Sequence, residues 1–204
     1  MNFDRTPAAL SILGLIVVIS ALGLMHAPGI IERNLLRPYY LLRDRAYSTL
    51  ITCGFVHKDF GHLFFNGLTL YFFGPGLEWR IGTGRFIALY FIGLVVSSLG
   101  TVYKQRNNPE YRSLGASGAI LAVLFAYIVY YPTNVIYLYF ALPIPAVLFA
   151  FGYLGYTWWA SRNARDGINH DAHLDGAITG LVFVGVTDNE VWVRAFRTVG
   201  DMLS

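Results

Sequence analysis

A serine and a histidine stand at the beginnings of two apolar segments that lie far apart in the sequence. Ser117 lies within the segment 115–118 (Gly-Ala-Ser-Gly), and His173 precedes Gly176 and Gly180 by three and seven residues. Glycines beside a serine leave nearby backbone N–H groups accessible, which suits a nucleophile next to its own oxyanion-binding donors. A histidine near neutral pH can take the serine proton and return it to a leaving amine. The pair indicates acyl transfer, with peptide hydrolysis as the obvious case.

Three polar side chains are predicted on one face of another, otherwise apolar helix. His62, Asn66 and Thr69 are spaced i, i+4 and i+7 among Leu, Phe and Tyr residues. Such a face must meet protein or water, because a polar group left unpaired in hydrocarbon is costly. It indicates either a functional site or a polar seam that joins two helices by hydrogen bonds. We expect His57, which precedes this helix, to be structural or interfacial.

Glycines near the serine and the histidine are predicted to let membrane helices approach closely, because small residues are common at such contacts. The predicted helix-packing positions are Gly115, Gly118, Gly176 and Gly180.

The histidine has no carboxylate placed to orient it along its own helix. Asp171 and Asp175 lie two residues on either side of His173, which is about 200° around a helix. We therefore expect any catalysis to use a serine–histidine dyad without an acidic third member.

The composition excludes several classes of protein. Of 204 residues, 55% are hydrophobic and 13% are charged, whereas a soluble domain carries about 25% charged residues. This excludes a soluble enzyme, a disordered chain and a nucleic-acid-binding domain. The net charge of +3 suits lipid headgroups. Because Cys53 is the single cysteine, neither an intrachain disulfide nor a metal–thiolate cluster is expected.

The gaps between charged residues predict six membrane spans, because one crossing needs about 20 mostly apolar residues. Residues 113–161 carry no formal charge, and the sequence 131–134 with Pro143 and Pro145 divides them into two helices. We expect one all-α, multi-pass domain over residues 1–204. The loop between the first two spans looks interfacial, and the first span is too long for a typical signal peptide. The spans are predicted at about 8–25, 61–77, 85–103, 115–130, 145–160 and 172–187.

The residues allow two other kinds of site, a metal site and an ion-transport site. Four of the five histidines and two aspartates fall near the second and sixth spans, but a metal site would have to be assembled from distant segments without an H-E-x-x-H motif. An ion-coupled transporter could use His173 and Asp175 within the membrane. That interpretation gives no role to the glycine-flanked Ser117.

Together these motifs, in this order on these spans, resemble the rhomboid intramembrane serine proteases. Glu78 and the segment 82–85 also resemble that family's turn between spans two and three. The resemblance implies a six-helix rhomboid-like bundle in which Ser117 is the nucleophile and His173 the general base and acid. It implies an oxyanion hole made by the side chains of His62 and Asn66 and the backbone N–H of Ser117.

The resemblance also implies the partners of the protein. Its substrates would be transmembrane segments of other membrane proteins, locally unwound and cut near the membrane surface after a small residue. The lipid bilayer would be the other partner, and no metal, organic cofactor or nucleic acid is implied. We expect a multi-pass protein of the bacterial plasma membrane. The alternative within the family is a catalytically silent protein that binds membrane clients.

The sequence differs from the rhomboid pattern at two places, and its charge distribution predicts a different membrane orientation from that of the family. Ser48-Thr49 stands where many members have Trp-Arg, and Leu121 stands where some members place an aromatic residue against the histidine. The positive-inside rule puts both termini outside, because five basic residues, Arg5 among them, fall on the terminal side and ten on the other. The family implies cytoplasmic termini, which we follow.

Overall fold

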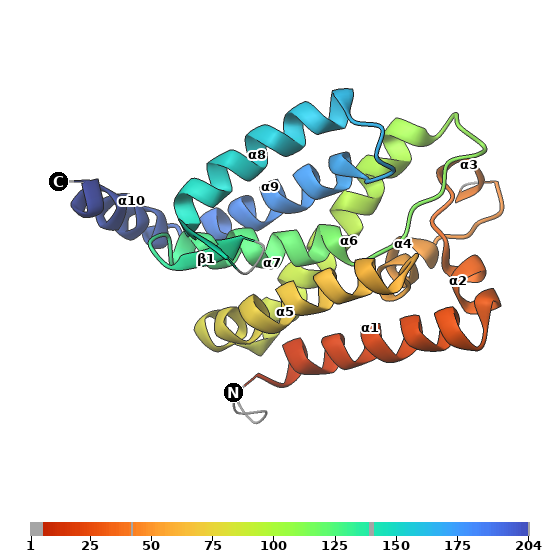
Figure 1. The fold of residues 1–204 in the computed structure, drawn as a ribbon, viewed down its shortest axis with the longest axis horizontal. Coiled ribbons are helices and arrows are strands. Elements are labelled where there is room, and N and C mark those ends of the chain that lie inside the picture. Colours follow the sequence, from red (N-terminus) through yellow and green to blue (C-terminus); the bar gives the residue numbers. More distant parts are fainter. Residues whose placement is uncertain (1–5, 42, 139–140, 204) are drawn as a thin grey trace.

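The computed structural model describes residues 6–41, 43–138 and 141–203, and most of them are helical (Figure 1). Arg5, which entered the charge count, lies outside the described residues. Six helices form the bundle: α1 (Pro7–Met25), α5 (Phe60–Ile81), α6 (Thr83–Gln105), α7 (Ser117–Tyr130), α8 (Ala146–Asn163) and α9 (His170–Thr187). The other elements are α2 (Pro28–Asn34), α3 (Pro38–Leu41), α4 (Thr49–Thr52), η2 (Cys53–Phe55), β1 (Val135–Leu138), β2 (Leu142–Pro145) and α10 (Glu190–Leu203).

Each of the six apolar segments predicted as spans overlaps one of the six long helices. The fourth helix begins at Ser117 rather than at residue 115, because Gly115 has a positive φ of 114° that a helix cannot contain. By length and composition, α1 and α6 are long and apolar enough to cross a membrane, and α7 is a shorter apolar helix among the described residues.

Helix α7 forms the centre of the bundle (Figure 1). Eleven of its fourteen residues are buried, as expected for a helix that is apolar on all sides. It packs against α5, α6 and α9, while α8 lies on the outside. The first residue of this buried helix is Ser117, so the fold places that hydroxyl inside the bundle.

Glycines allow α9 to lie directly against α7. A Cβ on Gly176 would collide with the carbonyl oxygen of Gly118, and a Cβ on Gly180 would collide with that of Ala122. A Cβ on Gly118 would collide with the Ser97 hydroxyl on α6. These three glycines therefore set the distances between α6, α7 and α9.

A buried carboxylate anchors the beginning of α1 to the end of α5. Glu78 is 1% exposed, and its two oxygens accept hydrogen bonds from the backbone N–H groups of Ala8 (3.1 Å) and Ala9 (2.7 Å). The Thr83 hydroxyl donates to the same carboxylate at 2.8 Å. The first N–H groups of a helix lack acceptors within the helix, and a negative charge near them is stabilised by the helix dipole. The Glu78 carboxylate supplies both the acceptors and the negative charge.

Several elements were not predicted from the sequence. The segment between α7 and α8 carries an antiparallel hairpin of β1 and β2, in which Val135 pairs with Pro145. The loop from residue 26 to 60 contains α2, α3, α4 and η2, and it packs on the bundle because Leu36 forms a β-bridge with Ser113. Helix α10 follows the last apolar run, which was predicted to end before Asp188.

Replacing Glu78 with alanine should lower the free energy of unfolding by about 3 kcal/mol, because two buried N–H groups lose a charged acceptor. Unfolding in mixed detergent micelles measures this change. Glu190→Ala is the matched control, since its carboxylate is 84% exposed and should change stability by less than about 0.5 kcal/mol. Equal stabilities of the two variants would contradict the anchoring role of Glu78.

Candidate active site

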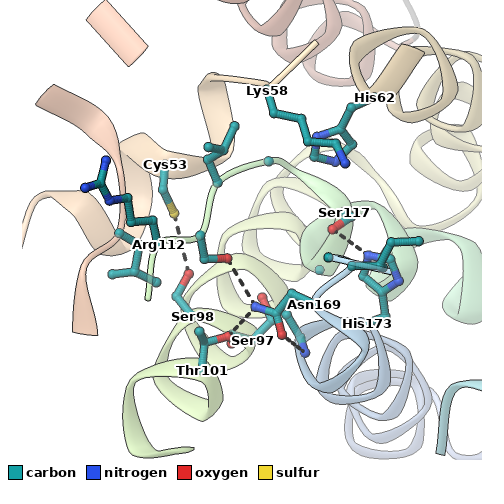
Figure 2. Close-up of a pocket in the computed structure, with 18 of the residues that line it drawn as sticks. Cys53, Lys58, His62, Ser97, Ser98, Thr101, Arg112, Ser117, Asn169 and His173 are labelled. Atoms are coloured by element: carbon teal, nitrogen blue, oxygen red, sulfur yellow. Dashed lines mark hydrogen bonds between the residues drawn. The ribbon is translucent and has the colours of Figure 1, made fainter. Parts of the chain in front are cut away.

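The serine and the histidine singled out in the sequence are hydrogen-bonded to each other. The Oγ atom of Ser117, at the first residue of α7, lies 2.9 Å from Nε2 of His173, in the first turn of α9 (Figure 2). The two residues are 56 positions apart. The close contact between α7 and α9 therefore brings a hydroxyl to an imidazole in the geometry that proton transfer needs.

An asparagine that the sequence analysis missed fixes the start of α9. The side-chain oxygen of Asn169 accepts from the N–H of Ala172 at 3.1 Å, which caps the helix. Its amide nitrogen donates to Thr101 on α6 at 2.8 Å and to Ser113, before α7, at 3.1 Å (Figure 2). Asn169 thus joins the three segments that surround the serine–histidine pair. An asparagine three residues before the start of an apolar run was the available signal.

The second nitrogen of His173 contacts a tyrosine rather than an acid. Nδ1 lies 3.2 Å from the hydroxyl oxygen of Tyr153 on α8. Asp171 instead pairs with Lys104, with Nζ and Oδ2 2.6 Å apart, and the carboxylate of Asp175 lies against Gly100 on α6. As expected from the helix geometry, neither aspartate orients the imidazole. Tyr153 was not predicted, because nothing in its local sequence marks it.

His62 lies beside the loop that leads to the serine. Asp59 caps α5 by accepting from the N–H of His62 at 2.7 Å, which fixes where the helix begins. A Cβ on Gly115 would come within 2.5 Å of Cε1 of the His62 ring. The prediction of Gly115 as a helix-packing position is therefore corrected: it lies in the loop before α7, where its positive φ and missing side chain make room for the imidazole.

Asn66 and Thr69 each donate a hydrogen bond to a backbone carbonyl of their own helix. The Asn66 amide nitrogen donates to the carbonyl oxygen of His62 at 2.9 Å, and the residue is 7% exposed. The Thr69 hydroxyl donates to the carbonyl of Phe65 at 2.8 Å. Asn66 is not among the residues that line the cavity, whereas His62, Ser117 and His173 are.

An open cavity of about 840 Å³ leads to the serine–histidine pair. Ser97, Ser98 and Thr101 on α6 form part of its wall, and loop residues 108, 110–115 and 167–169 form another part. The hydroxyl groups on this wall are hydrogen-bonding partners for water that enters the open cavity. Among the described residues, no group of three or more His, Cys, Asp and Glu side chains could hold a metal ion.

His57 supports the site from outside the cavity. It is fully buried, and its Nδ1 lies 2.9 Å from the hydroxyl of Ser20 on α1. Because Ser20 donates its own hydrogen to the carbonyl of Phe55, it accepts one from His57. The ring packs edge-on against His62, with centroids 4.8 Å apart. His57 therefore has the structural role expected, and burial lowers its pKa from 6.5 to about 3.

The sequence of this chain is similar to those of known proteins of one family. The family model described as "Rhomboid domain" matches residues 44–188. The chain belongs to the rhomboid family. RHOMBOID-like protein 12, mitochondrial, of Arabidopsis thaliana is 30% identical over 149 residues, which are 66% of this chain and 44% of that protein. Rhomboid protein 1, mitochondrial, of Saccharomyces cerevisiae is 30% identical over 153 residues, 71% of this chain and 44% of that protein.

A bacterial relative is also similar to part of this rhomboid chain. The Bacillus subtilis protein named "Putative rhomboid protease YdcA" is 34% identical over 79 residues, which are 39% of each chain. The chain spans less than half the length of these curated relatives. Since rhomboid proteins are embedded in membranes, this chain is an integral membrane protein.

The two departures from the rhomboid pattern have structural counterparts. The Thr49 hydroxyl donates to the carbonyl of Ala46 at 2.7 Å, which stabilises the turn where many members have Trp-Arg. Leu121 is 7% exposed and belongs to the hydrophobic cluster against which Tyr153 packs. In this chain the aromatic residue that contacts the histidine is Tyr153 of α8, through its hydroxyl.

The low pKa of His57 predicts a loss of stability in mild acid. The folded protein holds His57 neutral down to about pH 3, whereas the unfolded chain binds a proton below about pH 6.5. The contribution of His57 is therefore present above pH 6.5 and is lost as the pH falls toward 3. Between pH 7 and pH 5 the free energy of unfolding should fall by roughly 2 kcal/mol from this residue.

Unfolding of wild type and His57→Gln at both pH values measures this effect. The variant should lack this part of the pH dependence, and His26→Gln, at the exposed end of α1, should retain it. A wild-type slope in His57→Gln would contradict the assignment.

Proposed function

We propose that this rhomboid protein is an intramembrane serine endopeptidase that hydrolyses peptide bonds in or near transmembrane segments of other membrane proteins. The observation that carries the proposal is the 2.9 Å contact between Ser117 Oγ and His173 Nε2 at the wall of an open cavity. This contact favours the enzyme over a silent client-binding protein, because a protein that only holds its clients needs no such pair.

The reaction would proceed in two acyl-transfer steps. Nε2 of His173 takes the Ser117 proton while Oγ attacks the scissile carbonyl, and the resulting imidazolium gives that proton to the leaving amine. A water molecule from the cavity then gives a proton to His173 and attacks the acyl-enzyme. The carboxyl product leaves as the proton returns to Ser117.

The oxyanion of each tetrahedral intermediate would be held by three donors. The N–H of Ser117 belongs to the first turn of α7, where backbone N–H groups have no acceptor within the helix and a negative charge is favoured. His62 contributes its side chain from the cavity wall. Asn66 already gives one amide hydrogen to the His62 carbonyl, so its second amide hydrogen is the one proposed for the oxyanion.

The membrane arrangement is part of the proposal. The six long helices are proposed to cross the bilayer, with α1 and α6 as the clearest candidates by length and apolar composition. A substrate segment must unwind locally, because a helical peptide bond is enclosed in its own hydrogen-bonded turn. Helix-breaking residues in the substrate should therefore favour cleavage, next to a small residue that the site accepts.

The host membrane and orientation stay predictions. Three relatives are named as mitochondrial proteins and one comes from a bacterium, so the comparisons give no support to the predicted bacterial plasma membrane. The proposed location is a multi-pass position in a lipid bilayer, with both termini on the cytoplasmic side.

Ser117→Ala should abolish cleavage of a transmembrane substrate in proteoliposomes, and His173→Ala should lower it to near background, because each variant removes one half of the proton-transfer pair. Gel analysis and mass spectrometry of the products measure the cleavage. Ser161→Ala, which removes a hydroxyl bonded only to the Trp158 carbonyl and Arg162, should cleave like the wild type. Cleavage that persists in Ser117→Ala would overturn the proposal.

His62→Ala should lower kcat by about 10² to 10³, with little change in KM, because an oxyanion donor acts in the transition state. Steady-state cleavage kinetics measure both constants. The control is Thr69→Val on the same helix, because the Thr69 hydroxyl donates to the backbone carbonyl of Phe65. An unchanged kcat in His62→Ala would remove this side chain from the oxyanion hole.

A further inference from the structure

The hydrogen-bonding of His173 defines which of its two nitrogens carries a hydrogen. A neutral imidazole has one N–H donor and one acceptor nitrogen. If Nε2 accepts the Ser117 hydroxyl at 2.9 Å, the hydrogen lies on Nδ1. The atom that faces Nδ1 is the hydroxyl oxygen of Tyr153, at 3.2 Å. In that tautomer the phenol oxygen accepts from Nδ1–H.

Other side chains close to His173 are engaged elsewhere. Asp171 is paired with Lys104. The ring centroids of His170 and His173 lie 6.0 Å apart, and Nε2 of His170 lies 3.0 Å from Oδ2 of Asp166. Within residues 6–41, 43–138 and 141–203, the side chain hydrogen-bonded to Nδ1 is that of Tyr153.

Aromatic packing fixes the phenol in place. The Tyr153 ring stacks on Phe149 with centroids 5.5 Å apart, and it lies 5.8 Å from Phe125 on α7. These contacts restrict the rotation of the side chain and so define the position of its hydroxyl. Leu121, one turn after the serine, packs in the same hydrophobic cluster and offers no polar atom to the imidazole.

We propose that Tyr153 is a positioning residue that holds His173 in the tautomer and orientation in which Nε2 acts as the base toward Ser117. This inference rests on the proposed function. The phenol takes the place that a carboxylate occupies in a serine–histidine–aspartate triad, but it is neutral. It therefore orients the imidazole without adding the charge that would stabilise an imidazolium.

Because Tyr153 belongs to α8, its hydroxyl connects the candidate site to an outer helix. Only three residues of α8 are buried among its eighteen, namely Ala146, Thr157 and Ala160, and α8 lies on the outside of the bundle (Figure 1). The orientation of His173 thus depends on where α8 sits against α7 and α9.

Tyr153→Phe tests the proposal, because it keeps the ring packing and removes only the hydroxyl. We expect kcat for substrate cleavage to fall about 10-fold with KM unchanged within twofold, since one orienting hydrogen bond is lost in the reacting complex. Tyr156→Phe is the matched control on the same helix, as its ring contacts His170 rather than His173. It should keep the wild-type kcat.

Nitrogen-15 NMR of the protein in micelles, with its histidines labelled, measures the tautomer of the imidazole and does not depend on substrate cleavage. In the wild type, the His173 signals, assigned by their loss in His173→Gln, should show a single tautomer protonated at Nδ1. Tyr153→Phe should show a mixture of tautomers. This measurement also applies to the inactive Ser117→Ala background, in which the Tyr153 contact should still hold Nδ1 protonated.

The outcomes separate the two proposals. A wild-type kcat in Tyr153→Phe, or an unchanged tautomer, overturns the positioning role and leaves the protease intact if Ser117→Ala is inactive. Failure of the wild type to cleave any transmembrane substrate overturns the proposed function, and the kinetic role of Tyr153 falls with it.

Discussion

The contact between α7 and α9 is the interaction on which the rest of the site depends. Gly176 and Gly180 present bare backbone to the carbonyl oxygens of Gly118 and Ala122, so the two helices lie closer than side chains would allow. That distance is what places Ser117 within hydrogen-bonding reach of His173. A side chain at either glycine would move the helices apart, and the Ser117 hydroxyl away from the His173 imidazole.

A site inside an apolar bundle also requires that its polar groups be satisfied. Asn169 meets this requirement by bonding Thr101, Ser113 and the first turn of α9 at once, and Glu78 does so at the far end of the bundle by capping α1. The buried Glu78 bonds tie α1 to α5, and the partly buried Asn169 bonds tie α9 to α6 and to the segment before α7. Breaking any of them leaves a polar group without its partner.

The sequence predicted the features that depend on local pattern. Apolar lengths between charges indicated the long helices, and glycines beside Ser117 and His173 indicated both the pair and the close helix contact. Features that depend on contacts between distant segments could not be predicted in this way. Tyr153 and its partner His173 are 20 residues apart on different helices, and no local pattern connects them. The role of Gly115 was misjudged for the same reason, since it follows from the His62 ring.

The central claim is that the Ser117 hydroxyl at the cavity wall is reactive, and peptide mapping after treatment with a fluorophosphonate tests it most directly. Each serine of the chain competes for the reagent, and only one beside a general base should react at a low concentration. We predict a single adduct on the peptide that contains Ser117, and none when the protein is first denatured. An adduct on another residue, or equal labelling of folded and denatured protein, would contradict a nucleophile activated by His173.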